Sequence, residues 1–132
     1  QDDALVPELT VIENVEIPLV INGYSFKKRR GPVMEILRKL GLSEKILSYP
    51  ANLSGGERQR VSAARAVVHN PELILADEPT ANLDSDSADA VISAIDFLSS
   101  SGNTSVIITT HDERVIKRYP NRIKLLDGRI IR

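Results

Sequence analysis

The first half of the chain carries apolar residues at helical spacing, interrupted by short polar segments. The run VIENVEIPLVI, residues 11–21, follows the pattern Thr10-x-x-Glu13, which is typical of a capping box at the start of a helix. Asn22 and Gly23 then favour the end of that helix. A short apolar helix is therefore predicted over residues 11–21.

A second helix is predicted over PVMEILRKL, residues 32–40. Proline is favoured in the first helical turn, and Gly41 lies where a helix usually ends. Residues 43–47 fit one further helical turn. The basic run KKRR, residues 27–30, is expected to be a solvated loop, with contact to lipid headgroups or nucleic acid as the less favoured alternatives.

A third helix is predicted after Ser54, because Ser54-x-x-Glu57 repeats the capping-box pattern. The sequence His69-Asn70-Pro71 favours its end. His69 is expected in the last turn, where a cation complements the helix dipole, and no chemistry is assigned to it.

The pattern changes after residue 71, where short apolar runs alternate with a helical segment. Residues 73–76 (LILA) and 105–110 (SVIITT) are typical of strands buried on both faces. Between them, a helix over residues 86–99 is predicted to end at Gly102, and its apolar positions are Ala88, Val91, Ile92, Ile95 and Leu98. The alternation predicts an α/β unit with parallel strands.

The C-terminal segment favours a short helix over residues 114–119 and two extended segments, residues 122–126 and 129–131. Asp127-Gly128 between them favours a tight turn. We therefore expect two domains: a helical one over residues 1–70 and an α/β one over residues 71–132.

Composition narrows the possible functions. The chain has 132 residues, of which 42% are hydrophobic, enough for one modest core. Its formal net charge of −1 argues against a general nucleic-acid binder, and the lack of cysteine excludes disulfides and thiolate metal sites. No apolar run is long enough to span a bilayer, so membrane association is expected only through a partner.

Asp77 and Glu78 come directly after the LILA strand. In open α/β sheets, ligands bind outside the carboxyl ends of the strands. Two adjacent carboxylates there can divide the work, since one can hold Mg²⁺ and the other can orient an attacking water. The alternative is an acidic turn before Pro79 that binds no ligand.

His111 follows the second apolar strand, so it is expected at the same sheet edge as Asp77. A neutral imidazole there can donate to a phosphate oxygen or hold a water. The alternative is a residue at a helix start that is hydrogen-bonded only locally.

The turn Ser54-Gly55-Gly56 begins the third predicted helix. Helix starts attract anions, and glycine lets the backbone approach a ligand closely, so this turn predicts a phosphate site. A simple helix cap is the alternative, although capping requires only the serine. The usual phosphate cradle, GxxxxGK[ST], does not occur in the sequence.

Taken in order, these motifs resemble those of the ATP-binding subunit of ABC transporters. LSGGERQRV, residues 53–61, is similar to the family signature, and LILADEP, residues 73–79, to the Walker B strand. ANLDS, residues 81–85, resembles the D-loop, TTHD, residues 109–112, the switch-histidine loop, and Gln1 the glutamine loop. EPTANLD and KLLDGRI are similar to the subgroup that exports lipoproteins or macrolides, or serves cell division.

The resemblance implies a role for each matching residue. Asp77 would hold Mg²⁺ and Glu78 would polarise the attacking water. His111 would contact the γ-phosphate of ATP. Gln1 would sense Mg²⁺ and the water, and would couple the site to a transmembrane partner. The residues that would bind nucleotide held by a second subunit, or act across the dimer interface, are Ser54, Gly55, Gly56, Glu57 and Asp84.

The resemblance also implies a partial P-loop NTPase fold of the ABC type, with a parallel-strand core and a helical subdomain. In the family, the phosphate cradle and its strands precede the glutamine loop, whereas this chain begins at Gln1. We therefore expect a C-terminal fragment that alone neither binds ATP tightly nor hydrolyses it. Residues 105–110 are expected to have an unpaired apolar edge, which favours self-association.

The implied function is the ATP-hydrolysing subunit of a transporter, using ATP and Mg²⁺ to drive export from the cytoplasmic face of the cell membrane. Its implied partners are a transmembrane subunit and a second nucleotide-binding subunit, with no nucleic acid. Two alternatives remain: a non-catalytic module that supplies the signature in trans, and a soluble ABC ATPase acting on DNA or ribosomes. Residues 2–53 show no sustained heptads, which disfavours the coiled-coil DNA-repair type.

Overall fold

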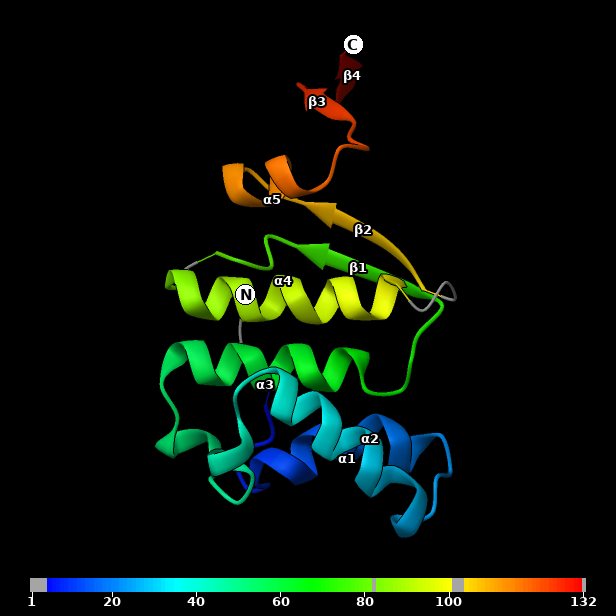
Figure 1. Cartoon of the computed structure of the whole chain (residues 1–132), viewed down its shortest axis with the longest axis vertical. Coiled ribbons are helices and arrows are strands. Elements are labelled where there is room, and N and C mark those ends of the chain that lie inside the picture. Colours follow the sequence, from blue (N-terminus) through cyan, green and yellow to red (C-terminus); the bar gives the residue numbers. More distant parts are fainter. Residues whose placement is uncertain (1–4, 82, 101–103, 132) are drawn as a thin grey trace.

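The computed structural model describes residues 5–81, 83–100 and 104–131 (Figure 1). The elements in chain order are α1 (Val11–Ile21), α2 (Phe26–Lys39), η1 (Ser43–Lys45), η2 (Pro50–Asn52), α3 (Gly55–Val67), β1 (Leu73–Asp77), α4 (Ser85–Ser100), β2 (Ser105–Thr109), α5 (Glu113–Arg118), β3 (Lys124–Leu126) and β4 (Arg129–Ile131). None of the helices in these described ranges is long and apolar enough to cross a membrane.

The elements are stacked along the long axis of the molecule (Figure 1). Helices α1 and α2 form one end, α3 and α4 lie in the middle, and β1 and β2 follow. Helix α5 and the hairpin of β3 and β4 form the opposite end. The largest group of buried apolar side chains comes mainly from α1, α2 and α3, with Ile74 of β1 and Ala94 of α4 joining it.

The local signals for helix ends at Thr10, Ser54 and Gly41 are confirmed. Both capping boxes form, at Thr10 before α1 and at Ser54 before α3. At the end of α2, Gly41 has a φ of 68°, and the N–H of Leu42 donates to the Leu37 carbonyl at 2.9 Å. This is the left-handed termination that glycine favours.

The predicted start of α2 at Pro32 is wrong, and so is the loop predicted at residues 27–30. The helix begins at Phe26, so the basic run lies in its first turns and Pro32 lies inside it. Two features explain this. Gly31 precedes the proline and has no Cβ to clash with its ring, and Arg29 Nε is held by Glu16 Oε2 of α1 at 2.8 Å.

The two predicted strands pair in parallel, as expected, from Leu73 opposite Ser105 to Asp77 opposite Thr109. The prediction that both faces are buried is wrong, because Leu75 is 72% exposed and Ile107 is 57% exposed. Alternate side chains point to opposite faces, and in the described ranges the helices bury only the face that carries Ile74.

The C-terminal strands β3 and β4 pair antiparallel. The turn between them places Asp127 at φ 47° and Gly128 at φ 72°, which confirms the predicted tight turn. His69 lies beyond the Val68 cap of α3 rather than in its last turn, because the chain turns at Asn70 with φ 50°. The predicted helix end at Gly102 and the side chain of Leu98 lie outside the part that the structure describes.

Candidate functional site

Parallel pairing of β1 and β2 brings the predicted acid pair and the predicted histidine to one sheet edge. Asp77, the last residue of β1, lies opposite Thr109, the last residue of β2. The N–H of Glu78 continues the pairing and donates to the Thr109 carbonyl at 2.9 Å. The expectation that His111 emerges at the same edge as Asp77 is confirmed.

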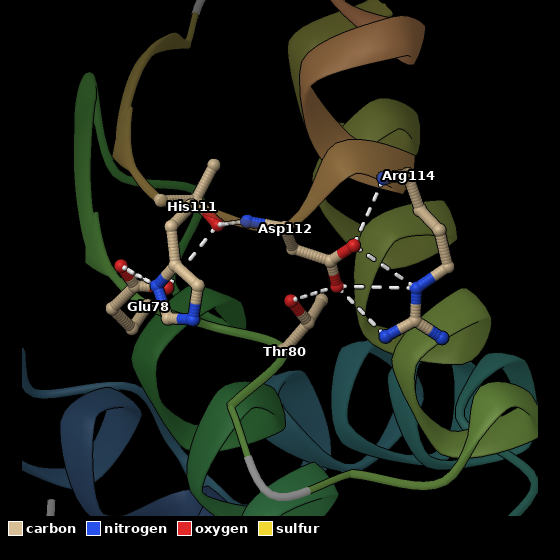
Figure 2. Close-up of polar contacts among 6 residues, drawn as sticks. Glu78, Thr80, His111, Asp112 and Arg114 are labelled. Carbon is tan, nitrogen blue, oxygen red and sulfur yellow. Dashed lines mark hydrogen bonds and ion pairs between the residues drawn. The ribbon is translucent and has the colours of Figure 1, made fainter.

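Glu78 and His111 face each other directly (Figure 2). The Nδ1 atom of His111 lies 2.8 Å from Oε1 of Glu78, and the hydroxyl of Thr110 donates to Oε2 at 3.2 Å. Glu78 has a φ of 46°, a left-handed conformation in which the chain turns sharply where the strand ends. Non-glycine residues in such sparsely populated backbone conformations cluster at functional sites.

The contact shifts the titration of both partners. The hydrogen bond from His111 is the main cause that lowers the pKa of Glu78, and the same bond raises the pKa of His111. Both shifts favour an imidazolium beside a carboxylate. Such an imidazolium donates Nδ1–H to Glu78 and still presents Nε2–H to an anion. The His111 side chain is 87% exposed, so that donor is accessible.

Asp77 is exposed at the same edge, and its carboxylate accepts a short hydrogen bond from the Thr109 hydroxyl. Among the described residues, no three His, Asp or Glu side chains gather into a metal-binding group. Mg²⁺ is often held by only one or two carboxylates together with phosphate oxygens and water. The oxygen chemistry of Asp77 fits that role, while Gln1, the other predicted metal contact, lies outside the described residues.

A second cluster, which the sequence did not reveal, holds the two loops of the site together (Figure 2). Asp112 accepts from the buried Thr80 hydroxyl at 2.8 Å and from Nη2 of Arg114 at 2.7 Å. Bonding from Arg114, chiefly from its side chain, holds the pKa of Asp112 far below its ordinary range. The available signal was the position of Asp112 just before a predicted helix, where capping residues occur.

The turn Ser54-Gly55-Gly56, here called the signature turn, lies at the start of α3. The N–H of Glu57 donates to Ser54 Oγ at 3.2 Å, and the N–H of Ser54 donates to Glu57 Oε2 at 2.8 Å. Gly55 is exposed, and a Cβ placed there would meet only the end of the Arg58 side chain, at 3.8 Å. The turn therefore combines a helix cap with an open approach to backbone N–H groups in the first helical turn.

Gly56 has a different reason to be glycine. A Cβ at this position would lie 2.9 Å from Ser87 Oγ and 3.6 Å from Asp84 Oδ2 at the start of α4. Asp84 accepts from the Ser87 N–H at 2.8 Å, and this bond lowers the pKa of Asp84. Nη1 of Arg60 also donates a hydrogen bond to Ser87 Oγ, so side-chain contacts hold α3 against α4 at this point.

The structure thus forms two groups from the predicted residues. Asp77, Glu78 and His111 meet at the strand edge, and Gly56 meets Asp84 where α3 contacts α4. Helices α3 and α4 start on the left side of Figure 1, and the arrows of β1 and β2 point toward that side.

Comparison with known proteins connects this arrangement to one family. The sequence model of the family described as ABC transporter matches residues 1–81, more than half of the chain. The chain belongs to the ABC transporter family. The observed α/β fold with parallel strands agrees with this membership.

Its relatives include subunits named lipoprotein-releasing system ATP-binding protein LolD. The protein from Francisella tularensis (strain FSC 198) is 48% identical over 127 residues, which cover 96% of this chain and 55% of the relative. The protein from Buchnera aphidicola (strain APS) is 44% identical over 126 residues, with the same coverages. The chain therefore spans about half the length of the curated relatives it matches.

Solved structures of ABC cassettes share the fold. One is a dimeric structure of MJ0796, named a bacterial ABC transporter cassette, with a TM-score of 0.87 at 37% identity. The match covers 100% of this chain and 59% of that cassette. The same cassette in a post-hydrolysis state, bound to ADP and Pi, has a TM-score of 0.86 over the same coverages. The ABC-type α/β fold predicted from the motifs is thereby confirmed.

Proposed function

We propose that this chain provides the signature and switch elements of an ATP-binding subunit that powers lipoprotein export. The observation that carries the proposal is the pairing of Glu78 with His111 at the carboxyl edge of two parallel strands. Membership of the ABC transporter family supports the reaction, and similarity to subunits named for lipoprotein release supports the cargo.

In this proposal, the residues of the strand edge divide the work. Glu78 orients the attacking water, and His111 presents Nε2–H to the γ-phosphate while Nδ1–H stays on Glu78. Asp77 is one carboxylate ligand of Mg²⁺, whose charge offsets that of the phosphates. Gln1 remains a proposed contact to Mg²⁺ and the water.

The signature turn serves a second nucleotide-binding subunit. The Ser54 hydroxyl and the backbone N–H groups of Gly55 and Gly56 face the γ-phosphate of ATP held by that subunit, while Glu57 fixes the turn by accepting the Ser54 N–H in the capping box. Asp84 lies against the same turn and acts across the subunit interface. We further propose that residues 1–70 form a helical domain and residues 71–132 an α/β domain, acting with a transmembrane partner at the cytoplasmic face.

A trapping experiment tests this proposal. An intact relative, such as the Francisella subunit with Gln in place of its Walker B glutamate, is mixed with this chain with and without ATP. We expect an ATP-dependent complex by size-exclusion chromatography. Gly55→Asp, which has space for its side chain but opposes the phosphate, should abolish the complex.

Asn121→Asp is the matched control, because it adds the same charge at an exposed position after α5. It should leave the complex unchanged. A complex that forms without ATP, or that tolerates Gly55→Asp, contradicts the proposed site.

A second candidate function is supply of the signature in trans without catalysis. It is favoured because the Ser54 cap and both glycines of the turn are in place at the start of α3. On either proposal, the 132-residue chain alone should bind MgATP only weakly. Calorimetric titration that gives micromolar affinity contradicts this expectation, and stimulation of an intact subunit's ATPase activity supports the trans role.

A further inference from the structure

The connection between α1 and α2 forms a surface that the proposed ATPase function does not use. We define the α1–α2 tip as residues 20–30, from the last turn of α1 to the first turns of α2. It lies at the end of the molecule opposite the β3–β4 hairpin (Figure 1). The tip is therefore a protruding end of the molecule.

The tip is strongly basic. Lys27, Lys28, Arg29 and Arg30 are consecutive, and no acidic residue occurs between Glu16 and Glu35. Glu16 holds Arg29 Nε at 2.8 Å and lies 3.7 Å from Arg30 Nη1. Glu16 thus faces only two of the four cations, and Lys27 and Lys28 are exposed to solvent.

Large apolar side chains lie beside these cations. Ile21 is 79% exposed and Phe26 is 60% exposed, while Val20 and Tyr24 are also exposed. The guanidinium carbons of Arg29 and Arg30 lie 5.2 and 5.9 Å from the centre of the Phe26 ring. Exposed aromatic and aliphatic groups beside Lys and Arg are typical of segments that bind in the membrane interface.

The placement of the charges is locally unfavourable for the helix. Cations in the first turn of a helix are repelled by the positive end of its dipole, and α2 has no acidic residue in its first turn. Gly31 and Pro32 add poor helix formers directly after the basic run. Departures of this kind from local preference are expected where a segment has a function.

We propose that the α1–α2 tip binds the surface of an anionic phospholipid bilayer. Lys27, Lys28 and Arg30 contact lipid phosphates, while Ile21 and Phe26 enter the headgroup region. The apolar side chains distinguish this occupant from nucleic acid, whose phosphates would leave Ile21 in water. The proposal does not depend on ATP hydrolysis, and it adds a direct lipid contact to association through a partner.

Vesicle sedimentation of the 132-residue chain tests the proposal. We expect binding to vesicles of phosphatidylcholine with about one third phosphatidylglycerol and much weaker binding to phosphatidylcholine alone. Each Lys near an anionic surface contributes about fivefold in partitioning, so Lys27→Gln with Lys28→Gln should weaken binding about 25-fold. Raising the salt from about 0.05 M to 0.5 M should also weaken it, since screening shortens the Debye length.

Arg122→Gln with Lys124→Gln is the matched control, because it removes the same charge from exposed positions near the opposite end. This variant should bind vesicles as the parent chain does. Equal binding to neutral vesicles, equal losses in the two double variants, or binding only to an acidic protein without vesicle binding would overturn the proposal.

A fluorescent reporter gives an independent readout. The chain contains no tryptophan, so Phe26→Trp introduces a single one at the tip. Its emission should shift to the blue on addition of anionic vesicles. Tyr49→Trp, which lies near the start of α1, should show no shift, because Ser48 is bonded to Val11 at the other end of that helix. An unshifted Phe26→Trp emission would also overturn the proposal.

Discussion

His111 lies 2.8 Å from the carboxylate of Glu78, although 33 residues separate them along the chain. The contact forms because β1 and β2 are parallel neighbours and each residue follows the end of its strand. This contact joins the imidazole of His111, which can carry a proton, to the Glu78 carboxylate, which we propose orients the attacking water. The titration of this pair is therefore the most direct probe of the site.

The first prediction concerns pH. Because His111 has a raised pKa and Glu78 a lowered one, the pair stabilises the fold while both are charged. The stability contributed by His111 is fully present below the pKa of His111 in the unfolded chain. It is lost as pH rises through the higher pKa of His111 in the folded chain. The stability contributed by Glu78 is fully present above the pKa of Glu78 in the unfolded chain. It is lost as pH falls through the lower pKa of Glu78 in the folded chain.

An NMR titration of the His111 ring measures this directly. Glu78→Gln should lower the pKa of His111 toward its ordinary value. Glu113→Gln removes a nearby carboxylate that is not bonded to the ring, and it should leave that pKa unchanged. The same pKa in the parent chain and in Glu78→Gln would show that the pair does not form in solution.

The second prediction compares the two glycines of the signature turn. Gly56→Ala places a Cβ 2.9 Å from Ser87 Oγ, and overpacking of this kind costs about 1–3 kcal/mol. Gly55→Ala has space, and it should be neutral or stabilise the helix by up to about 1 kcal/mol. Urea unfolding of both variants checks the difference.

Adding Ser87→Ala to Gly56→Ala removes the oxygen that the new Cβ would meet. The double variant should therefore lose less stability than the two separate losses added together. Strict additivity would mean that Gly56 and Ser87 are not in contact.

The third prediction concerns the bond between Thr80 and Asp112, which holds the loop after β1 to the start of α5. Thr80→Val keeps the shape of this buried side chain but removes its hydroxyl bond to a charged carboxylate, so it should cost about 1.5–3 kcal/mol of unfolding free energy. Thr80→Ser keeps the donor and should cost less than Thr80→Val. Thermal unfolding of both variants distinguishes the outcomes, and a larger loss in Thr80→Ser would contradict the bond.

The fourth prediction concerns the open face of the sheet. Ile74 is buried and Leu75 is exposed, although they are neighbours in β1. Ile74→Lys should unfold the chain, since it buries a charge, whereas Leu75→Lys should leave the fold intact. If the unpaired edge and open face cause self-association, Leu75→Lys should also reduce it in light scattering. A parent chain that stays monomeric at high concentration would contradict that expectation.

Much of the local structure was predictable from sequence. The two capping boxes, the termination at Gly41 and the turn at Asp127-Gly128 depend on hydrogen bonds or dihedral angles within a few residues. The parallel strands were predictable because their apolar runs flank a helical segment. The sheet edge shared by Asp77 and His111 followed from that arrangement.

The helical start of α2 was not predictable in this way. The proline favoured a helix start at residue 32 and the basic run favoured a loop, but Glu16 on α1 holds Arg29, and Gly31 has no Cβ to clash with the proline ring. Likewise, nothing in the sequence indicated that the Ser87 side chain packs against Gly56, where a Cβ would clash with it. The exposure of Leu75 depended on which sheet face the helices cover.

The sequence by itself determined the order of the helices and strands, several of their ends, and the ABC-type motifs, because each depends on neighbouring residues. The tertiary structure decided which of those residues meet: His111 with Glu78, Thr80 with Asp112, and Gly56 with Ser87. These contacts join residues about thirty positions apart, so their geometry is set by strand pairing and helix packing. No local pattern encodes that geometry, since the same short motifs can be brought together or kept apart by the packing of the elements between them.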